Sequence, residues 1–409
     1  MTYVKLAWRN IWRNKRRTII TGLTMALGIA LTIFFVAWGQ GVYDRLIDQA
    51  VRLQAGHITL EHRAYRDAPS VDLWISHAPE LEAQLAKWPE IRRVKPIILG
   101  QGMIKSGAGS LGAMLVGVKP SVETGTSPLV SSIKEGRYIQ DTDKAVAVIG
   151  SQLAKRLNVT IGKKIVIATN DASGNLVEEL CRVKGIFKTG SDEIDTYVIQ
   201  VPIDFARTVF RYPPDAATQL GLILKKADHE KKVIKMAREQ LKSSTIAILP
   251  WQDVMPEIAS YIRMDSSSNY IFNGLLLFLV LFTIFNTILM SVLERQREFA
   301  VLIAIGTKPS EIALLVFFES VFLALVGCTG GVVLGSIIAK FFNVVGIDLS
   351  WFIKGGISIS GFALSTKLFT KITWGILLAP SLIVFCAVLI VALIPMRRAK
   401  RVSVADMLR

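Results

Sequence analysis

Four long apolar segments stand out from the otherwise mixed pattern of hydrophobic and polar positions in this 409-residue chain. They cover residues 18–38, 271–293, 312–342 and 373–394. Each is long enough to cross about 30 Å of hydrocarbon as a helix that rises about 1.5 Å per residue. The first lacks the short apolar core and small-residue cleavage site of a removable signal peptide. The pattern therefore predicts an α-helical membrane protein with four transmembrane helices.

Between the first two spans, residues 39–270 form a predicted α+β domain that is large enough for more than one subdomain. Its outer parts have the pattern of βαβ units, with strands and helices at 56–60, 78–87, 94–104, 219–224, 228–241 and 244–249. Residues 106–214 instead show short strands separated by glycine and Asx turns, at 115–118, 146–149, 164–168, 179–187 and 197–201, with one helix at 152–157. We therefore predict two similar α/β halves with a β-rich insert between them.

Residues 1–17 are basic and contain no acidic residue. On a helical wheel one side is apolar and the other basic, formed by Val4, Ala7, Trp8 and Ile11 and by Lys5, Arg9, Arg13 and Arg16. This pattern predicts an amphipathic helix that lies flat on an anionic membrane surface. A disordered basic segment that only sets the orientation of the chain is the alternative.

Residues 294–311, between the second and third spans, begin with charges and continue with an apolar run. Phe299, Leu302, Ile303 and Gly306 recur at helical spacing. Gly306 can adopt the left-handed conformation that ends a helix, and Thr307 and Pro309 can begin the next one. We therefore predict a short helix whose apolar stripe fits a groove on another protein. A helix that lies among lipid headgroups is the alternative.

The composition agrees with a membrane protein, since 51% of the residues are hydrophobic and the mean hydropathy is +0.44. A net charge of +16 is compatible with nucleic acid or a membrane surface, but many basic residues lie beside the apolar spans. No nucleic-acid-binding motif accompanies them. The positive-inside rule places both termini, the 294–311 segment and the 395–409 tail in the cytoplasm, and the 39–270 domain and the 343–372 loop across the membrane.

Motifs for catalysis or metal binding are not found in the sequence. It contains no GxxxxGK[ST], HExxH or GxSxG pattern, and its three cysteines are scattered. The spacing of His57 and His62 fits neither a helix face nor a strand face, and Asp192, Glu193 and Asp195 are predicted to form a solvated turn. We therefore predict no enzyme, no metal site and no cofactor in this chain.

The third span contains glycines every four residues, at Gly327, Gly331 and Gly335. This repeat predicts a helix face that approaches another helix closely, although glycine is also tolerated in lipid without such a contact.

Three groups of residues resemble the FtsX/MacB-type permeases of ABC transporters, and most closely the lipoprotein-releasing (Lol) permeases. They are Leu6-Ala7-Trp8-Arg9-Asn10 with Arg16-Arg17-Thr18; Glu294-Arg295-x-Arg297-Glu298 followed by Ala304-x-Gly306; and Pro395-x-Arg397-Arg398-Ala399 with Ala405-Asp406-Met407-Leu408-Arg409. Weaker similarity to lipoprotein-release members lies in Gly185-Ile186-Phe187-x-Thr189-Gly190 with Asp195, and in Arg211-Tyr212-Pro213.

The resemblance implies a Porter-like subdomain with a Sabre-like insert, in a permease dimer made with a second copy or a paralogue. It implies a cytosolic ABC ATPase dimer that binds ATP and Mg²⁺ and is contacted by Arg297, Glu298, Phe299, Leu302 and Gly306. It also implies a cavity for acyl chains, lined by Met25, Ile29, Ile33, Phe278 and Phe282. Phe299-Ala300 stands where Ile-Gly is commoner, which would adjust the fit to the ATPase.

The leading hypothesis is therefore a permease subunit, in a bacterial inner membrane, that extracts acylated lipoproteins for transfer to the outer membrane. The hairpin at 169–178 is short and lacks proline, so direct docking of a periplasmic lipoprotein carrier stays open. One alternative is a MacB-like mechanotransmission pump that works with an outer-membrane duct. Another is an FtsX-like signalling transducer, whose outer domain is usually smaller. A nucleic-acid partner is not expected.

Overall fold

The computed structural model describes residues 2–54, 56–241, 243–349, 357–359, 362–364 and 367–400. The chain divides into two compact units, which are described here one at a time. The helical unit comprises residues 1–43, 263–349 and 367–409, and the β unit comprises residues 44–262 and 350–366. Residues 401–409 of the basic tail lie outside the described residues.

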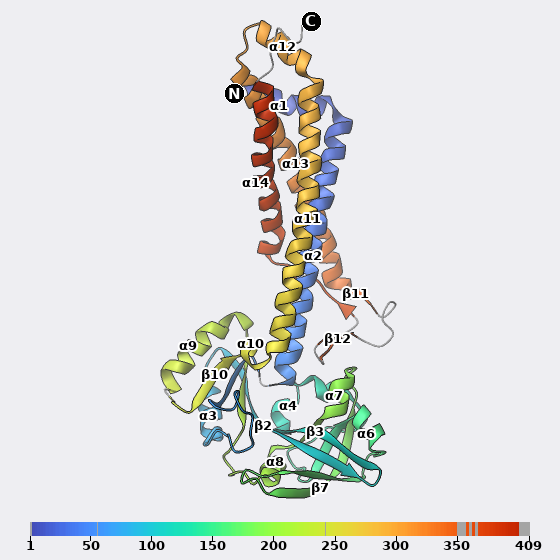
Figure 1. Ribbon diagram of the computed structural model, residues 1–409, viewed down its shortest axis with the longest axis vertical. Coiled ribbons are helices and arrows are strands. Elements are labelled where there is room, and N and C mark those ends of the chain that lie inside the picture. Colours follow the sequence, from blue (N-terminus) through green and yellow to red (C-terminus); the bar gives the residue numbers. More distant parts are fainter. Residues whose placement is uncertain are drawn as a thin grey trace. The chain divides into compact units, whose positions relative to one another are not determined.

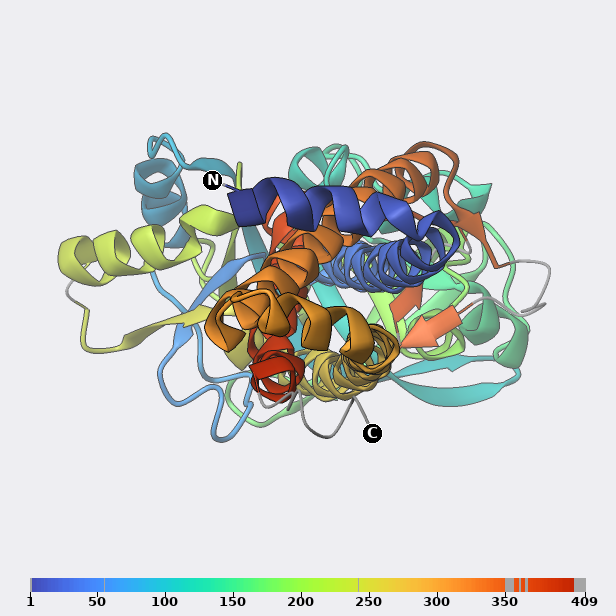
Figure 2. The same ribbon diagram turned by 90° about the horizontal axis from the view of Figure 1, so that it is seen from above.

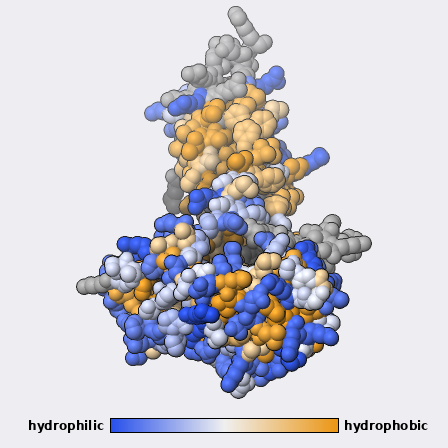
Figure 3. Space-filling view, turned by 60° about the horizontal axis from the view of Figure 1, so that its bottom comes forward, coloured by the Kyte–Doolittle hydropathy of each residue, from blue (hydrophilic) through white to orange (hydrophobic). Residues whose placement is uncertain are grey.

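The helical unit is built from long helices that run side by side (Figure 1). The helices are α1 (Thr2–Arg13), α2 (Lys15–Leu53), α11 (Pro256–Glu294), α12 (Gln296–Ala304), α13 (Pro309–Val345) and α14 (Trp374–Lys400). Within the described residues, four of them, α2, α11, α13 and α14, are long and apolar enough to cross a membrane. Figure 3 shows the apolar side chains that cover their surface.

Two of these helices are longer than the apolar spans that reveal them in the sequence. Both α2 and α11 contain 39 residues, so α2 continues past residue 38 and α11 begins before residue 271. They contact each other where Gly28 faces Val280, and again where Asn269 donates a hydrogen bond to the Tyr43 hydroxyl over 3.0 Å. The two short helices α1 and α12 lie across one end of the long helices (Figure 2).

In the β unit, the first and last predicted βαβ segments form one interleaved layer. Its strands β1 (Ile58–His62), β2 (Ile91–Ser106), β9 (Gln219–Leu224) and β10 (Ile246–Pro250) lie in the order β10-β1-β9-β2. All neighbouring pairs are antiparallel, so β1 and β2 are parallel with β9 between them. The two predicted βαβ segments are therefore not separate halves. They are split βαβ motifs that share one sheet, and α3 (Ala78–Leu85) and α9 (Glu230–Leu241) make their crossovers.

The rest of the same sheet closes into a barrel around its own apolar core. The strands follow the order β2-β3-β8-β5-β7, and β6 pairs with both β7 and β2. The 16-residue strand β2 therefore belongs to both the layer and the barrel. The added strands are β3 (Gly109–Val118), β4 (Ile133–Gly136), β5 (Val146–Gly150), β6 (Lys164–Asn170), β7 (Leu176–Phe187) and β8 (Val198–Pro202), of which β4 pairs only with β7.

Short helices connect these strands: α4 (Pro120–Glu123), α5 (Pro128–Ser131), α6 (Ser151–Arg156), α7 (Asp192–Tyr197), α8 (Ile203–Phe210) and α10 (Trp251–Val254), with a 3₁₀ turn at Ala227–His229. Small strands β11 (Ile347–Asp348) and β14 (Lys367–Leu368) pair in the helical unit, and β12 (Ile357–Ile359) pairs with β13 (Phe362–Leu364).

The acidic segment at residues 192–195 is the start of helix α7 rather than a turn, and although Asp192 and Glu193 are exposed as expected, Asp195 is not. Ser191 caps α7 by accepting a hydrogen bond from the Ile194 N–H. Asp195 is buried, and it accepts hydrogen bonds from the backbone N–H and the hydroxyl of Thr189 over 2.9 and 2.8 Å. Spacing alone missed this arrangement because the burial of Asp195 depends on the barrel around it.

A fully buried ion pair lies where α2 ends within the β unit. The Lys95 Nζ on β2 lies 2.7 Å from the Glu123 Oε1 on α4, and neither side chain is more than 2% exposed. Lys95 also donates hydrogen bonds to the carbonyls of Arg52 and Leu53, the last residues of α2, over 3.1 and 3.3 Å. A cation at this position satisfies carbonyls that have no partner within the helix and matches the negative end of the helix dipole.

Candidate functional site

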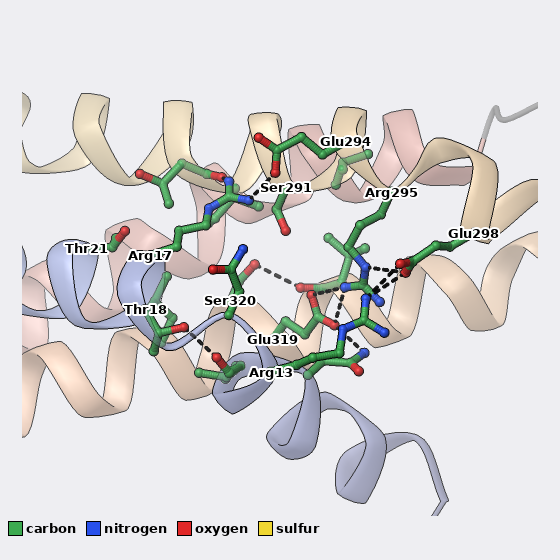
Figure 4. A pocket seen from close by; sticks show the side chains of 18 of the residues that line it. Arg13, Arg17, Thr18, Thr21, Ser291, Glu294, Arg295, Glu298, Glu319 and Ser320 are labelled. Carbon is green, nitrogen blue, oxygen red and sulfur yellow. Dashed lines mark hydrogen bonds and ion pairs between the residues drawn. The ribbon is translucent and has the colours of Figure 1, made fainter.

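A polar pocket of about 360 Å³ opens in the helical unit, at the end where α1 and α12 lie (Figure 4). Its walls come from α1, the first turns of α2, the last turns of α11, the start of α12 and the first half of α13. All of the side chains labelled in the figure are charged or carry a hydroxyl. Such a concentration of charge beside apolar helices is expensive unless the groups pair with one another.

Four charged side chains and Asn10 form a path of hydrogen bonds and ion pairs that begins and ends on α1, so the helix backbone closes it into a ring. Asn10 on α1 donates a hydrogen bond to Glu319 on α13 over 2.7 Å. Arg295 donates to both carboxylate oxygens of Glu319 over 2.8 and 3.1 Å, and to Glu298 over 3.0 Å. Arg13 donates to Glu298 over 2.8 and 2.9 Å, which returns the path to α1. We call Asn10, Arg13, Arg295, Glu298 and Glu319 the charged ring.

The two sides of the charged ring differ in their exposure to solvent. The side chains of Arg295 and Glu319 are only 16% and 15% exposed, whereas those of Arg13 and Glu298 are 59% and 49% exposed. The hydrogen bonds from Arg13, and then from Arg295, hold the pKa of Glu298 below its usual range. Arg295 also lies over the ring of Phe299, with 5.2 Å between its guanidinium carbon and the ring centroid. Arg295 is therefore the most heavily constrained member of the ring.

Local sequence explains why α12 is a separate short helix. Arg295 adopts a non-helical conformation between α11 and α12, and Gly306 has a positive φ of 106°. The Gly306 N–H bonds to the carbonyl of Ile303 and the Thr307 N–H to that of Leu302, the pair of bonds that defines a Schellman cap. Pro309 then begins α13 as expected, but Lys308 rather than Thr307 is its N-cap residue.

The structure separates the residues expected to contact an ATPase. Arg297 and Leu302 are exposed, Glu298 belongs to the charged ring, and Gly306 ends α12. Phe299 is 0% exposed and packs in the apolar core of the long helices, so in this structure it does not offer its ring to a partner. The exposed apolar side chains on this segment are Val301, Leu302 and Ile305. Helical spacing could not tell which apolar positions face inward.

The residues expected to line an acyl-chain cavity also fall into two separate groups. Met25, Ile29 and Ile33 on α2 are buried, whereas Phe278 and Phe282 on α11 are 61% and 54% exposed. The two phenyl rings stack with their centroids 6.3 Å apart. Because each residue turns a helix by about 100°, both rings lie on the far side of α11 from Val280, which faces α2. The two groups therefore do not line a common cavity within this chain.

The buried group of α2 instead lies against the three glycines of α13. Hypothetical Cβ atoms on Gly327, Gly331 and Gly335 would come within 2.7, 2.6 and 3.0 Å of the Cβ atoms of Met25, Ile29 and Ile33, respectively. Such distances leave no room for a side chain, so the two helices approach as closely as glycine permits.

Sequence reasoning missed Asn10, Arg13, Arg295 and Glu319 as members of a site. Glu319 was the available signal, because it is an acidic residue inside the third apolar span. An ionisable side chain in such a segment usually has a partner and a function. Its partners come from residues 10 and 295, which no local pattern connects to it.

Comparison with known proteins shows which family the chain belongs to. Residues 18–240 match the family model of the MacB-like periplasmic core domain, and residues 270–404 match that of the FtsX-like permease C-terminal region. The chain belongs to the MacB/FtsX-like permeases. It is thus an ABC transporter permease, which agrees with its four membrane-spanning helices and assigns the inserted domain to the periplasmic core type.

Relatives of this permease include proteins named for lipoprotein release and proteins named for export. The lipoprotein-releasing system transmembrane protein LolE of Haemophilus influenzae is 22% identical over 86% of this chain and 83% of that protein. The macrolide export ATP-binding/permease protein MacB of Nitrosomonas europaea is 23% identical over 81% of this chain but only 50% of that protein. The solved periplasmic region of MacB from Actinobacillus actinomycetemcomitans aligns with 49% of this chain and 92% of its own, at 15% identity and a TM-score of 0.37.

Proposed function

We propose that this permease is the membrane subunit of an ATP-driven transporter that extracts lipoproteins from the outer leaflet of the inner membrane for transfer to the outer membrane. The observation that carries the proposal is the similarity to LolE along 86% of this chain and 83% of that protein. Moving an acyl chain out of a bilayer costs roughly 0.8 kcal/mol per CH₂ group, so several chains cost tens of kcal/mol. Such a step needs both an energy source and an apolar binding surface.

The partner ATPase is proposed to bind the exposed apolar face of α12. Val301, Leu302 and Ile305 are exposed there on a helix held at both ends. In this proposal both termini and α12 are cytoplasmic, ATP and Mg²⁺ bind to the ATPase, and the Porter-like and Sabre-like parts are periplasmic.

The acyl chains are proposed to bind at the outer face of α11, where Phe278 and Phe282 stack. Because these rings point away from α2, a cavity there requires a second permease subunit as its other wall. This differs from a cavity inside one chain, and it fits the expected dimer of two permease copies or paralogues. A periplasmic lipoprotein carrier would receive the cargo. Because the 169–178 hairpin is short, the proposal does not specify which permease subunit docks that carrier.

Depletion of the permease in its own host tests the proposal. Acylated proteins labelled with radioactive palmitate should accumulate in the inner-membrane fraction, and normal sorting to the outer membrane would contradict the proposal. Expression of Phe278→Ala/Phe282→Ala should restore sorting poorly. The matched control is Phe341→Ala, which removes a similarly exposed phenylalanine from α13 and should restore sorting fully.

The ATPase contact has a separate test in the full-length complex. Leu302→Asp should abolish co-purification of the ATPase, because an unpaired carboxylate buried in an interface costs several kcal/mol. Leu176→Asp, at an exposed position of the β unit, serves as the control and should retain the ATPase. Retention by Leu302→Asp would instead favour a helix that lies among lipid headgroups.

A MacB-like pump is the second candidate, since the identity to MacB within the matched region, 23%, is as high as the 22% to LolE. This candidate expects an adaptor and an outer-membrane duct to co-purify, without bound lipid. A mass spectrum of the purified complex that shows triacylated species would decide for lipoprotein extraction.

A further inference from the structure

The charged ring contributes to fixing the orientation of α12, which its short connections to α11 and α13 do not fix by themselves. Gln296–Ala304 is only nine residues long, and it is joined to α11 through Arg295 and to α13 through residues 305–308. A helix this short is marginal on its own in water, so its orientation depends on tertiary contacts. Phe299 and Ala300 fix one side of it by burial, and the ring engages its first turn through Glu298.

The other half of the ring is anchored by α1. Ala7 and Ile11 are buried, and the ring of Trp8 packs edge-on against Phe322 of α13, with 5.3 Å between centroids. Asn10 and Arg13 therefore extend from a helix that is already attached to α13. On the apolar side of α1, Ala7 and Ile11 therefore face the protein, whereas Val4 and Trp8 are 40% and 44% exposed.

We propose that Glu319 is a positioning residue that orients α12, by holding Arg295 while α1 closes the ring through Asn10, Arg13 and Glu298. Glu319 is suited to this role because it accepts hydrogen bonds from both Asn10 and Arg295 and is largely shielded from solvent. Charge-assisted pairs are stronger when shielded, so the Arg295–Glu319 contact carries more of the constraint than the exposed Arg13–Glu298 contact. The inference rests on the proposed function only in naming an ATPase as the partner that binds α12 in this orientation.

Amide hydrogen exchange of the full-length protein in detergent tests the proposal without any partner. In Glu319→Gln, exchange of residues 296–304 should rise about tenfold, because loss of a charge-assisted contact favours local opening. The matched control is Glu294→Gln, which removes another carboxylate at the same end of the unit, paired with Arg17 over 3.0 Å but outside the ring. The control should change exchange of residues 296–304 by less than about twofold.

Unchanged exchange in Glu319→Gln, or an equal rise in the control, would overturn the proposal. Charge reversal separates orientation from general packing: Arg295→Glu and Glu319→Arg should each raise exchange, and the double variant should restore much of the protection. If the single variants do not fold, Arg13→Gln opens only the exposed side of the ring and should raise exchange of residues 296–304 about two- to threefold. No change in that variant would also contradict the ring.

Capture of the ATPase gives the functional readout. Glu319→Gln should weaken capture by about tenfold while leaving some complex, whereas Leu302→Asp removes the contact surface itself. Normal lipoprotein sorting after depletion would refute the proposed function and leave the exchange result intact. Unchanged exchange would refute the positioning role even if sorting fails.

Discussion

The two ion-pair systems of this permease differ in what surrounds them. Lys95 and Glu123 in the β unit are at most 2% exposed, and Lys95 also donates hydrogen bonds to the last carbonyls of α2. The charged ring in the helical unit combines a shielded pair, Arg295–Glu319, with an exposed pair, Arg13–Glu298. The exposure of an ion pair determines how much stability is lost when one partner is removed, because the remaining charge cannot recover its hydration if it is buried.

The difference indicates two kinds of mechanical role. A pair that is buried on all sides holds one geometry and makes any alternative costly. A ring that is exposed on one side can open there while its shielded side stays closed. The first system is suited to fixing the end of a long helix, and the second to orienting a short helix that a partner engages.

Removal of the buried cation should have the largest effect. Lys95→Met leaves Glu123 buried without its partner, which typically destabilises a protein by about 3–5 kcal/mol. Amide exchange of β2 in the full-length protein should therefore rise by more than a hundredfold. Lys105→Met provides the control, because the Lys105–Glu178 pair is exposed and should contribute only about 0–1 kcal/mol. Equal exchange in both variants would show that burial does not set the weight of these pairs.

Disruption of the glycine contact between α2 and α13 should have the next largest effect on stability. It tests whether the helical unit also contains a contact that tolerates no other geometry, as the buried pair does. Gly331→Ala would place a Cβ atom 2.6 Å from the Cβ of Ile29, so the helices must move apart at a cost of about 1–3 kcal/mol. The melting temperature in detergent measures the effect. Gly274→Ala on α11 meets no atom within 4 Å and should be neutral or slightly stabilising. A normal melting temperature for Gly331→Ala would contradict the close approach.

Opening the exposed side of the ring should have a small effect on stability. In Arg13→Ala, the lost pair with Glu298 is worth about 0.2–1 kcal/mol after solvent screening. Arg295→Ala should cost clearly more than this, because it leaves the shielded Glu319 without its main partner. Melting temperatures of the two variants compare the two sides directly. Equal losses would show that the ring has no shielded side.

The pH dependence of Glu298 should be the smallest effect. Its pKa is lowered by Arg13 and Arg295, so the carboxylate contributes stability above its ordinary pKa of about 4.3. That contribution is lost as the pH falls through the lowered pKa of the folded state. The difference in melting temperature between the native protein and Glu298→Gln should stay constant from pH 7 to about pH 5 and be lost only at pH values below the ordinary pKa of about 4.3. Loss of this difference in melting temperature near pH 6 would contradict the lowered pKa of Glu298.

Much of the fold follows from local pattern. The apolar spans predict the four long helices because each must satisfy its own backbone hydrogen bonds in lipid. The strand at 219–224 is found at those residues, where a short and largely apolar run is buried at every position. The interleaving of the two βαβ units and the shared strand β2 could not be predicted, because they depend on pairings between strands far apart in sequence.

The candidate site was only partly accessible from sequence. The spacing of Phe299, Leu302 and Gly306 predicts a short helix with a defined end, and the structure contains one. The same spacing does not reveal that Phe299 packs inward while Leu302 stays exposed. Phe278 and Phe282 were grouped with Met25 because all are apolar and in spans one and two, but the rotation of each helix separates them.

The sequence by itself determined which segments enter a membrane, where the short helix between the second and third spans ends, and which permease family the chain resembles. These properties depend on hydrophobicity and backbone preference, which act over a few neighbouring residues. Only the tertiary structure decided that Glu319 meets Asn10 and Arg295, and that Lys95 is buried against the end of α2. Electrostatic pairing acts across space between residues up to about three hundred positions apart, so burial and partner appear only once the chain has folded.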